Sequence, residues 1–247
     1  MLRLSVITVY KMGNLSELLK TYHSVYCQTF KPYEYIIVVS GVKETKNFKS
    51  NFKQDFVRFI INSDKSLYNA MNIGCNASCG NAVVFLNGGD TFYGSNSINL
   101  ISTQYKPGKC LLFRTLQKYQ ELNFIRPKIS NISLLKTSPS HQSFIAPLPQ
   151  AKIFNFNEKN IICADTLWMN QLVSKYGVII SSSILSTFEL GGISNYPTLH
   201  SIRKRFLCAG FLRSCKEFLK FLLIKMLKPK LYYKLVLSRN CELYINE

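Results

Sequence analysis

The sequence predicts an α/β fold built around a mostly parallel sheet. Three apolar runs rich in β-branched residues occupy 4–10, 35–39 and 82–86, and stretches with helical spacing lie between them. The runs are apolar throughout rather than alternating, which is typical of strands buried on both faces of a parallel sheet. The chain has 247 residues, enough for such a domain to bury its own core.

The first elements follow one another as strand, helix and strand. The strand at 4–10 is followed by a helix at 15–28, whose leucines recur at helical spacing. With the strand at 35–39 this makes a βαβ unit. The chain continues with a strand at 56–61, a helix at 67–77 and a strand at 82–86.

The strand at 82–86 ends in the sequence Asn87-Gly88-Gly89-Asp90. Ligands of open α/β sheets bind beyond the carboxyl ends of the strands, so Asp90 is placed to meet a ligand. Taken alone, these four residues also fit an ordinary turn, because Asn, Gly and Asp are common turn residues.

Periodicity weakens after residue 110. Asp165 starts a helical segment and is either a helix cap or a functional carboxylate. The elements predicted in this half are short strands at 110–115 and 121–126, a loop at 138–142, a helix at 165–176 and a loop at 191–194.

The composition is strongly basic and poor in aspartate. Lys and Arg total 31 against 13 acids, a formal net charge of +18, while 47% apolar residues exclude a disordered basic protein. The four aspartates are Asp55, Asp64, Asp90 and Asp165. The charge predicts a polyanionic partner, and the few aspartates limit where metal binding or proton transfer can occur.

The charge is concentrated near the C-terminus. Residues 201–239 hold eleven basic residues and one acid. Within them, 211–226 has an apolar arc flanked by basic residues, which predicts an amphipathic basic helix. Such a helix either packs against the folded domain or lies in the plane of an anionic membrane surface.

The cysteines and the N-terminus indicate a cytoplasmic protein. The eight cysteines include no CxxC pair, which favours reduced thiols packed as small hydrophobes. The first residues lack the pattern of a signal peptide, and no apolar run reaches the roughly 18 residues that a membrane span needs.

Five motifs in family order and spacing resemble family 2 glycosyltransferases. They are 64–74 (DKSLYNAMNIG), 85–92 (FLNGGDTF), 141–144 (HQSF), 163–165 (CAD) and 191–194 (GGIS). The strongest likeness, over 1–95, is to small bacterial exopolysaccharide and O-antigen transferases of the colanic-acid type. It implies a GT-A fold at 1–197, with a nucleotide-binding half at 1–95, an acceptor-binding half at 96–197, and a basic amphipathic membrane-associating tail at 198–247.

The resemblance also implies a nucleotide-sugar site. Tyr10 would stack on the nucleobase, and Asp64 would accept the imino proton of the base, which favours uracil. Further donor-binding residues implied by the likeness are Thr8, Val9, Ser40, Asn72, Asn87 and Gly89.

The same resemblance assigns the chemistry to two aspartates. Asp90 would hold Mg²⁺ or Mn²⁺ against the donor diphosphate, where one carboxylate plus phosphate oxygens suffices. Asp165 would be the general base for the acceptor hydroxyl, with inversion at the anomeric carbon. Donor or acceptor contacts implied here are His141, Gln142, Trp168, Gly191 and Gly192; His141 is also consistent with an ordinary loop histidine.

One position departs from the family pattern. After the second strand these enzymes usually carry an aspartate that contacts the ribose and base, whereas this chain has Ser40. The change affects donor affinity or nucleotide preference. It also leaves open a degenerate, non-catalytic member that acts as a scaffold.

The function expected from the resemblance is transfer of a sugar from a UDP-sugar to a saccharide on a polyprenyl diphosphate, in the synthesis of a bacterial surface polysaccharide. Residues 201–239 would hold the enzyme on the anionic inner leaflet of the bacterial inner membrane. A basic nucleic-acid-binding protein is the alternative. The tail lacks the interleaved aromatic and Arg/Gly pattern of single-strand binders, so no nucleic acid is expected.

Overall fold

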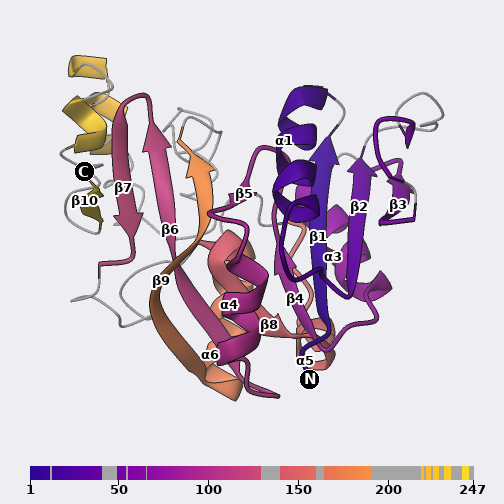
Figure 1. The fold of residues 1–247 in the computed structure, drawn as a ribbon. Coiled ribbons are helices and arrows are strands. Elements are labelled where there is room, and N and C mark those ends of the chain that lie inside the picture. Colours follow the sequence, from indigo (N-terminus) through magenta and orange to yellow (C-terminus); the bar gives the residue numbers. More distant parts are fainter. Residues whose placement is uncertain are drawn as a thin grey trace.

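A computed structural model shows a large curved sheet with helices on both of its faces (Figure 1). The residues it describes are 1–11, 13–40, 49–53, 55–64, 66–128, 140–159, 164–190, 218–219, 221–223, 225–227, 231–234 and 241–244. Within these residues the sheet has ten strands, and along its main path their order is β10-β7-β6-β8-β4-β1-β2-β3.

The first half of the sheet is parallel, as the continuous apolar runs predict. β1 (Leu4–Lys11) lies between β2 (Glu34–Ser40) and β4 (Ala82–Phe85), and β2 pairs with β3 (Val57–Asn62). The βαβ unit is confirmed by α1 (Leu15–Tyr26), which begins where the Asn14 side chain accepts a hydrogen bond from the Ser16 backbone N–H.

The second half of the sheet is mixed, which corrects the prediction of a mostly parallel sheet. β6 and β9 pair in parallel, but the other pairings in this half are antiparallel because β6 and β7 form a hairpin and β8 and β10 run against their neighbours. The strands are β5 (Thr91–Phe92), β6 (Cys110–Tyr119), β7 (Leu122–Arg126), β8 (Phe144–Pro147), β9 (Val178–Glu189) and β10 (Glu242–Tyr244).

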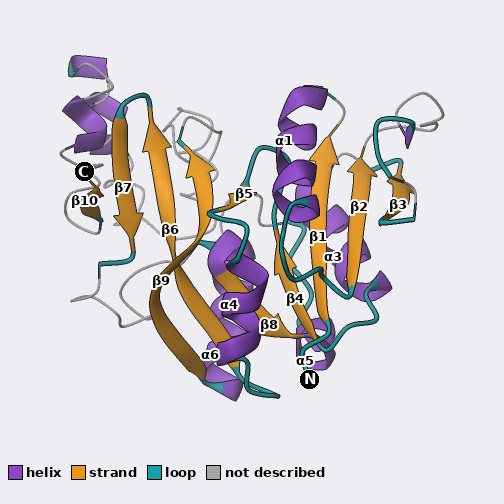
Figure 2. Cartoon of the chain, in the orientation of Figure 1, coloured by secondary structure: helices purple, strands orange, loops and turns teal. Residues whose placement is uncertain are grey.

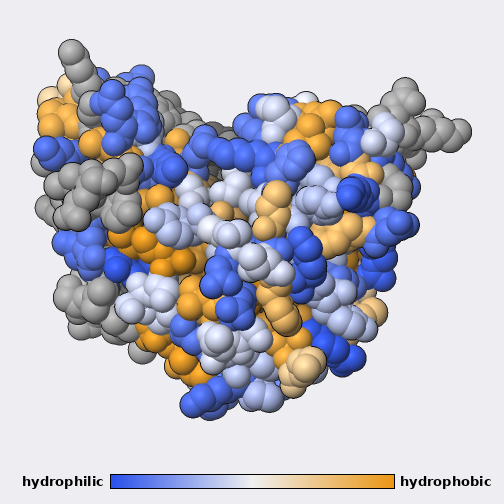
Figure 3. All heavy atoms as spheres, in the orientation of Figure 1, coloured by the Kyte–Doolittle hydropathy of each residue, from blue (hydrophilic) through white to orange (hydrophobic). Residues whose placement is uncertain are grey.

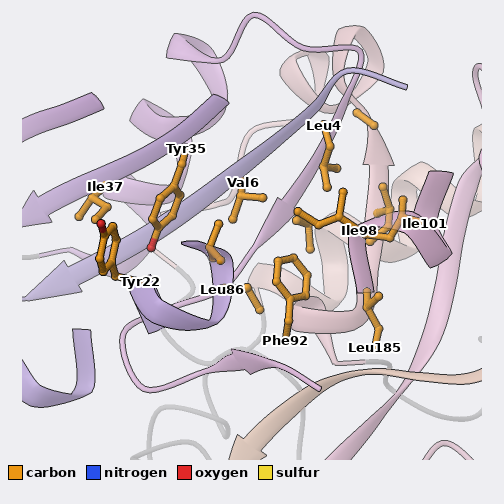
Figure 4. Close-up of a cluster of buried hydrophobic side chains, with 14 of the residues drawn as sticks. Leu4, Val6, Tyr22, Tyr35, Ile37, Leu86, Phe92, Ile98, Ile101 and Leu185 are labelled. Carbon is orange, nitrogen blue, oxygen red and sulfur yellow. The ribbon is translucent and has the colours of Figure 1, made fainter. Parts of the chain in front are cut away.

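Helices cover both faces of the sheet (Figure 2). Val6 and Ile37 belong to a core beneath α1 and α4, whereas Ile7 and Ile36 belong to a core on the other face. Figure 4 shows the first of these cores. The remaining helices are α3 (Leu67–Ala77), α4 (Ser97–Gln104), α5 (Leu148–Ile153), α6 (Ala164–Tyr176) and the short 3-10 helix η2 (His141–Ser143).

The C-terminal residues that the structure describes pack on the end of the sheet. β10 pairs with β7, and Tyr232, Tyr233 and Cys241 form a third core with Phe124 and Leu190. These segments fall within the predicted tail at 198–247, so part of that tail is integrated with the sheet. Most of the helix predicted at 211–226, including 211–217, lies outside the described residues.

Candidate active site

The loop after β4 places Asp90 at the carboxyl edge of the parallel strands. Its turn is closed by a hydrogen bond from the Asp90 N–H to the Asn87 carbonyl, at 2.9 Å. Gly89 has a φ of +100°, a conformation that favours glycine. Above this edge, the space-filling view is hollowed between the lobe that carries α1 and the lobe that carries β6 and β7 (Figure 3).

The Asp90 carboxylate is buried, and one of its oxygens accepts two hydrogen bonds. Its Oδ2 accepts hydrogen bonds from Gln142 Nε2 at 3.0 Å and from the Asn87 N–H at 3.2 Å. Burial raises the pKa of Asp90 to about 6, even though the charge of His141 and these hydrogen bonds act in the opposite direction.

His141, in η2, connects this loop to Asp165. Its Nδ1 lies 3.2 Å from Asp165 Oδ2, and its Nε2 lies 3.1 Å from Asn87 Nδ2. Burial alone would lower the pKa of His141, but the hydrogen bond and charge of Asp165, with the charge of Asp90, raise it. The charged ring has protons on both nitrogens, and a half-turn of the Asn87 amide then offers Nε2 an acceptor.

Asp165 lies in the first turn of α6 and is firmly positioned. Its Oδ1 accepts hydrogen bonds from the Thr166 N–H at 2.8 Å and from the Tyr68 hydroxyl at 3.4 Å. Burial by itself would raise the pKa of Asp165, but the hydrogen bond and charge of His141 outweigh it and lower the pKa. The carboxylate is therefore ionised and oriented in the neutral range.

A cluster of buried hydroxyls anchors η2 to β6 and β9. Ser143 Oγ donates to the Arg114 carbonyl at 3.0 Å and lies 2.7 Å from Thr115 Oγ1 and 2.6 Å from Ser186 Oγ. The three hydroxyls come from η2, β6 and β9. The cluster fixes the short helix that carries His141 and Gln142.

Several residues predicted to bind the nucleotide lie at the same edge of the sheet. Tyr10 ends the run of buried residues in β1, and a Cβ on Gly88 would lie 3.2 Å from its ring. Asp64 is exposed, and its Oδ1 accepts a hydrogen bond from the Ser66 N–H at 2.9 Å. Ser40 is 1% exposed, and its hydroxyl has no hydrogen-bond partner within the described residues.

Four predicted contacts have side chains committed elsewhere in the fold. The Thr8 hydroxyl is buried 2.9 Å from that of Tyr35, and the Val9 side chain belongs to the core beneath α3. The Asn72 amide donates to the Phe156 carbonyl and to Glu158 Oε1, each at 3.0 Å, and accepts from the Phe156 N–H at 2.8 Å. These three side chains therefore stabilise the fold. Only the backbone atoms of these residues are left for a direct contact with a nucleotide-sugar.

The fourth predicted contact whose side chain is committed to the fold is Trp168, which is 2% exposed and forms part of the core. Its ring stacks on Phe156, with ring centroids 4.6 Å apart. Phe156 stacks in turn on Tyr68, so the aromatic layer supports the residue that donates to Asp165. Gly191 and Gly192, also predicted as contacts, lie outside the described residues.

Sequence reasoning missed two residues of this site. Tyr68 lies within the motif at 64–74, where its position in the first turn of a predicted helix was the available signal. Arg126 ends β7, and its side-chain Nε is buried without a hydrogen bond among the described residues. No sequence motif includes Arg126, because it is brought toward the site only by the pairing of β7 with β6.

The donor set around Asp90 fits a divalent cation that is shared with a phosphate ligand. Within the described residues no group of three His, Cys, Asp or Glu side chains could hold a metal alone. Both hydrogen bonds to Asp90 within the described residues end on Oδ2, and burial raises the pKa of this carboxyl, so a bound cation would favour its charged form. One carboxylate plus phosphate oxygens is a usual arrangement for Mg²⁺.

Solved structures of other proteins have a similar architecture. S. aureus TarS matches with a TM-score of 0.56 at 15% identity, covering 89% of this chain and 43% of that one. TarS 1–349 in complex with UDP-GlcNAc matches with a TM-score of 0.58 at 14% identity, covering 89% and 71%. The mannosyltransferase PcManGT from Pyrobaculum calidifontis, in complex with GDP-Man and Mn²⁺, gives 0.58 at 11% identity, covering 83% and 61%.

The chain has the GT-A fold. It spans less than half of the length of the longer TarS chain. No family model and no curated protein matches the sequence. The loop at 87–90 and the start of α6 are linked through His141, which contacts both Asn87 and Asp165.

Proposed function

We propose that this chain is an inverting glycosyltransferase that uses a UDP-sugar and a divalent cation. The observation that carries the proposal is the hydrogen-bonded series Gln142–Asp90–Asn87–His141–Asp165, which joins residues distant in sequence at one edge of a GT-A sheet. Solved complexes of proteins with similar folds contain UDP-GlcNAc, or GDP-Man with Mn²⁺, which supports a nucleotide-sugar donor.

Asp165 would act on the acceptor. Its ionised carboxylate, held by Tyr68 and the Thr166 N–H, takes the proton of the acceptor hydroxyl as that oxygen bonds to the anomeric carbon. The bond from the anomeric carbon to the diphosphate breaks, and UDP leaves with its electron pair. Attack opposite to the leaving group inverts the configuration.

Asp90 would act on the donor. Mg²⁺ or Mn²⁺ bound there neutralises charge on the departing diphosphate. Gln142 and the Asn87 N–H hold Oδ2 of Asp90 in place, and His141 adds positive charge between the two aspartates. Tyr10, Asp64 and Ser40 lie at the ends of the strands or loops that would receive the nucleoside.

Three Asp→Asn variants test this assignment. Asp165→Asn and Asp90→Asn should each lower kcat/KM with UDP-sugars and a lipid-diphosphate GlcNAc or GalNAc acceptor by roughly 100-fold or more. Asp55→Asn is the matched control, because Asp55 is exposed. Calorimetry should find UDP binding with Mn²⁺ in the wild type and in Asp165→Asn. Absence of UDP binding to the wild type would favour the scaffold hypothesis instead.

We further propose that the C-terminal region docks on an anionic membrane near a polyprenyl-diphosphate acceptor. Phe218, Leu219, Leu222 and Met226 are exposed, from 40% to 81%, and helical spacing places them on one stripe. Leu223 and Leu227 of the same segment pack inward. These exposed apolar residues lie within 201–239, which holds eleven basic residues and one acid. Apolar residues exposed in such a basic region favour an anionic lipid surface. None of the described helices is long and apolar enough to cross a bilayer.

Co-sedimentation with liposomes tests this docking. Replacing Leu219, Leu222 and Met226 by Ser should abolish binding to anionic vesicles, whereas Ser at exposed Phe30 and Tyr33 should leave it unchanged. Binding of the wild type to DNA, with no binding to vesicles, would instead favour the nucleic-acid alternative. Salt should weaken the vesicle binding, since part of it is electrostatic.

A further inference from the structure

The β6–β7 hairpin and its flank hold two arginines in different environments. Arg114 donates through Nε to the Pro127 carbonyl at 3.1 Å, and its guanidinium pairs with Glu242. Arg126 is partly buried, with its Nε shielded from solvent, and this Nε donates no hydrogen bond within the described residues. Arg126 forms no ion pair with a described carboxylate, so its charge lacks the close partner that Arg114 has.

Strand register shows which way Arg126 faces. Arg126 lies directly opposite Thr115, and Thr115 lies opposite Ser186, so the three side chains share one face of the sheet. The Thr115 and Ser186 hydroxyls contact Ser143 of η2. Arg126 is therefore on the face of the sheet that η2 occupies.

The pairing along β6 also places Arg126 next to the active site. β7 ends with Arg126 opposite Thr115, and β8 starts with Phe144 opposite Leu112. These points are three residues apart on β6, or roughly 10 Å. η2 packs against β6 through Ser143, and its His141 and Gln142 contact Asp165 and Asp90.

The electrostatic surroundings leave Arg126 in need of an anion. Burial lowers the pKa of its guanidinium, and Cys241 and, to a smaller extent, the charge of Asp165 act against that effect. Asp165 is already engaged by His141, Tyr68 and the Thr166 N–H. A shielded guanidinium with an unused donor is costly unless a ligand satisfies it, and its planar fork suits phosphate oxygens.

We propose that Arg126 binds a phosphate group of a substrate beside Asp165. The binding site itself does not depend on the proposed transferase activity, but the identity of the substrate does. Under that activity the phosphate belongs either to the diphosphate of the nucleotide donor or to that of the lipid-linked acceptor. The chemistry is the same in both cases, and the two sources are separated by experiment.

Calorimetry on the full chain tests the site with inorganic pyrophosphate, UDP and uridine. Arg126→Gln should weaken pyrophosphate binding roughly tenfold or more, and Arg126→Lys should weaken it less. Arg58→Gln is the control, because Arg58 is an exposed arginine that pairs with Glu34. If the donor supplies the phosphate, Arg126→Gln also weakens UDP but not uridine. If the acceptor supplies it, UDP binding is unchanged and the loss appears for pyrophosphate added to protein saturated with UDP.

Two results would overturn the site. One is wild-type protein that binds no pyrophosphate. The other is unchanged pyrophosphate binding in Arg126→Gln, whether or not its melting temperature falls. Pyrophosphate binding that depends on Arg126 in a protein without transferase activity would refute the proposed function while supporting this site.

Discussion

Asp90 is a carboxylate kept in a place that favours its neutral form. It is 5% exposed, and its pKa is about 6 instead of the usual 3.8. Ionising it at neutral pH therefore costs folding free energy, on the order of 3 kcal/mol from the pKa difference. Such a cost is expected where a residue is positioned for a bound cation rather than for stability.

Replacing Asp90 by Asn should therefore stabilise the metal-free protein at pH 7. The folded-state pKa is raised, so the stability contributed by this group is complete below about pH 4 and is lost as pH rises through about 6. Urea unfolding should show Asp90→Asn more stable than wild type at pH 7, by up to about 3 kcal/mol, and similar to it at pH 4. An equal gain at both pH values would contradict the ionisation argument.

His141 should control the pKa of Asp165. His141→Gln retains a side chain that can hydrogen-bond to Asp165 but removes its charge, so the pKa of Asp165 should rise. The acid limb of the kcat/KM profile should then move to higher pH. The pKa can also be followed directly by NMR of the Asp165 carboxyl carbon.

His23→Gln serves as the control, since His23 lies exposed near the end of α1. A profile for His141→Gln that coincides with that of His23→Gln would rule out an electrostatic role for His141.

At the scale of an element, η2 has three residues and cannot hold its own position. Short 3-10 helices have strained hydrogen bonds and depend on their surroundings. Here the surroundings are the Thr115 and Ser186 hydroxyls, both 0% exposed, which meet Ser143. The buried polar cluster thus links the geometry of the site to the pairing of β6 with β9.

Ser143→Ala should loosen η2 and destabilise the protein. The change leaves the Thr115 and Ser186 hydroxyls short of a partner in the interior, at a cost of about 1–3 kcal/mol. Thermal unfolding measures the loss, and reduced transfer activity should accompany it because His141 and Gln142 move with η2. Ser182→Ala, at an exposed position of β9, should change neither. Equal stability of the two variants would show that the cluster contributes nothing.

At the scale of the whole molecule, the first half of the fold could be predicted closely from sequence. β1, β2, β3 and β4 start and end within one residue of the predicted strands, because burial on both faces gives continuous apolar runs. β9 was missed because its burial alternates irregularly through Ser181–Ser183, so neither strand nor helix spacing stands out. β10 was missed because three residues carry no detectable period.

The candidate site could likewise be predicted from the sequence only in part. Asp90 and Asp165 lie in recognisable motifs, whereas the contact between Tyr68 and Asp165 joins residues 97 positions apart and depends on how α3 and α6 pack. The Asn72 side chain is hydrogen-bonded to the Phe156 backbone, and Trp168 is buried in the core. Each fills a space between α3, α6 and the loop at 154–159 that the linear sequence does not reveal.

At the scale of the whole molecule, the C-terminal strand returns to the sheet. β10 covers the edge of β7, and its Glu242 pairs with Arg114, whose side chain is 9% exposed. Removing one partner of a shielded pair leaves a charge uncompensated. Glu242 itself is 40% exposed, and water therefore reduces the penalty.

Glu242→Gln should accordingly lower the free energy of unfolding by about 1–2 kcal/mol. Glu189→Gln removes the partner of Lys20 in an ion pair whose side chains are 50% and 64% exposed, and it should cost less than about 0.5 kcal/mol. Urea unfolding of the two variants compares a shielded pair with an exposed one. If Glu242→Gln is as stable as the wild type, the ion pair between Arg114 and Glu242 does not stabilise the fold.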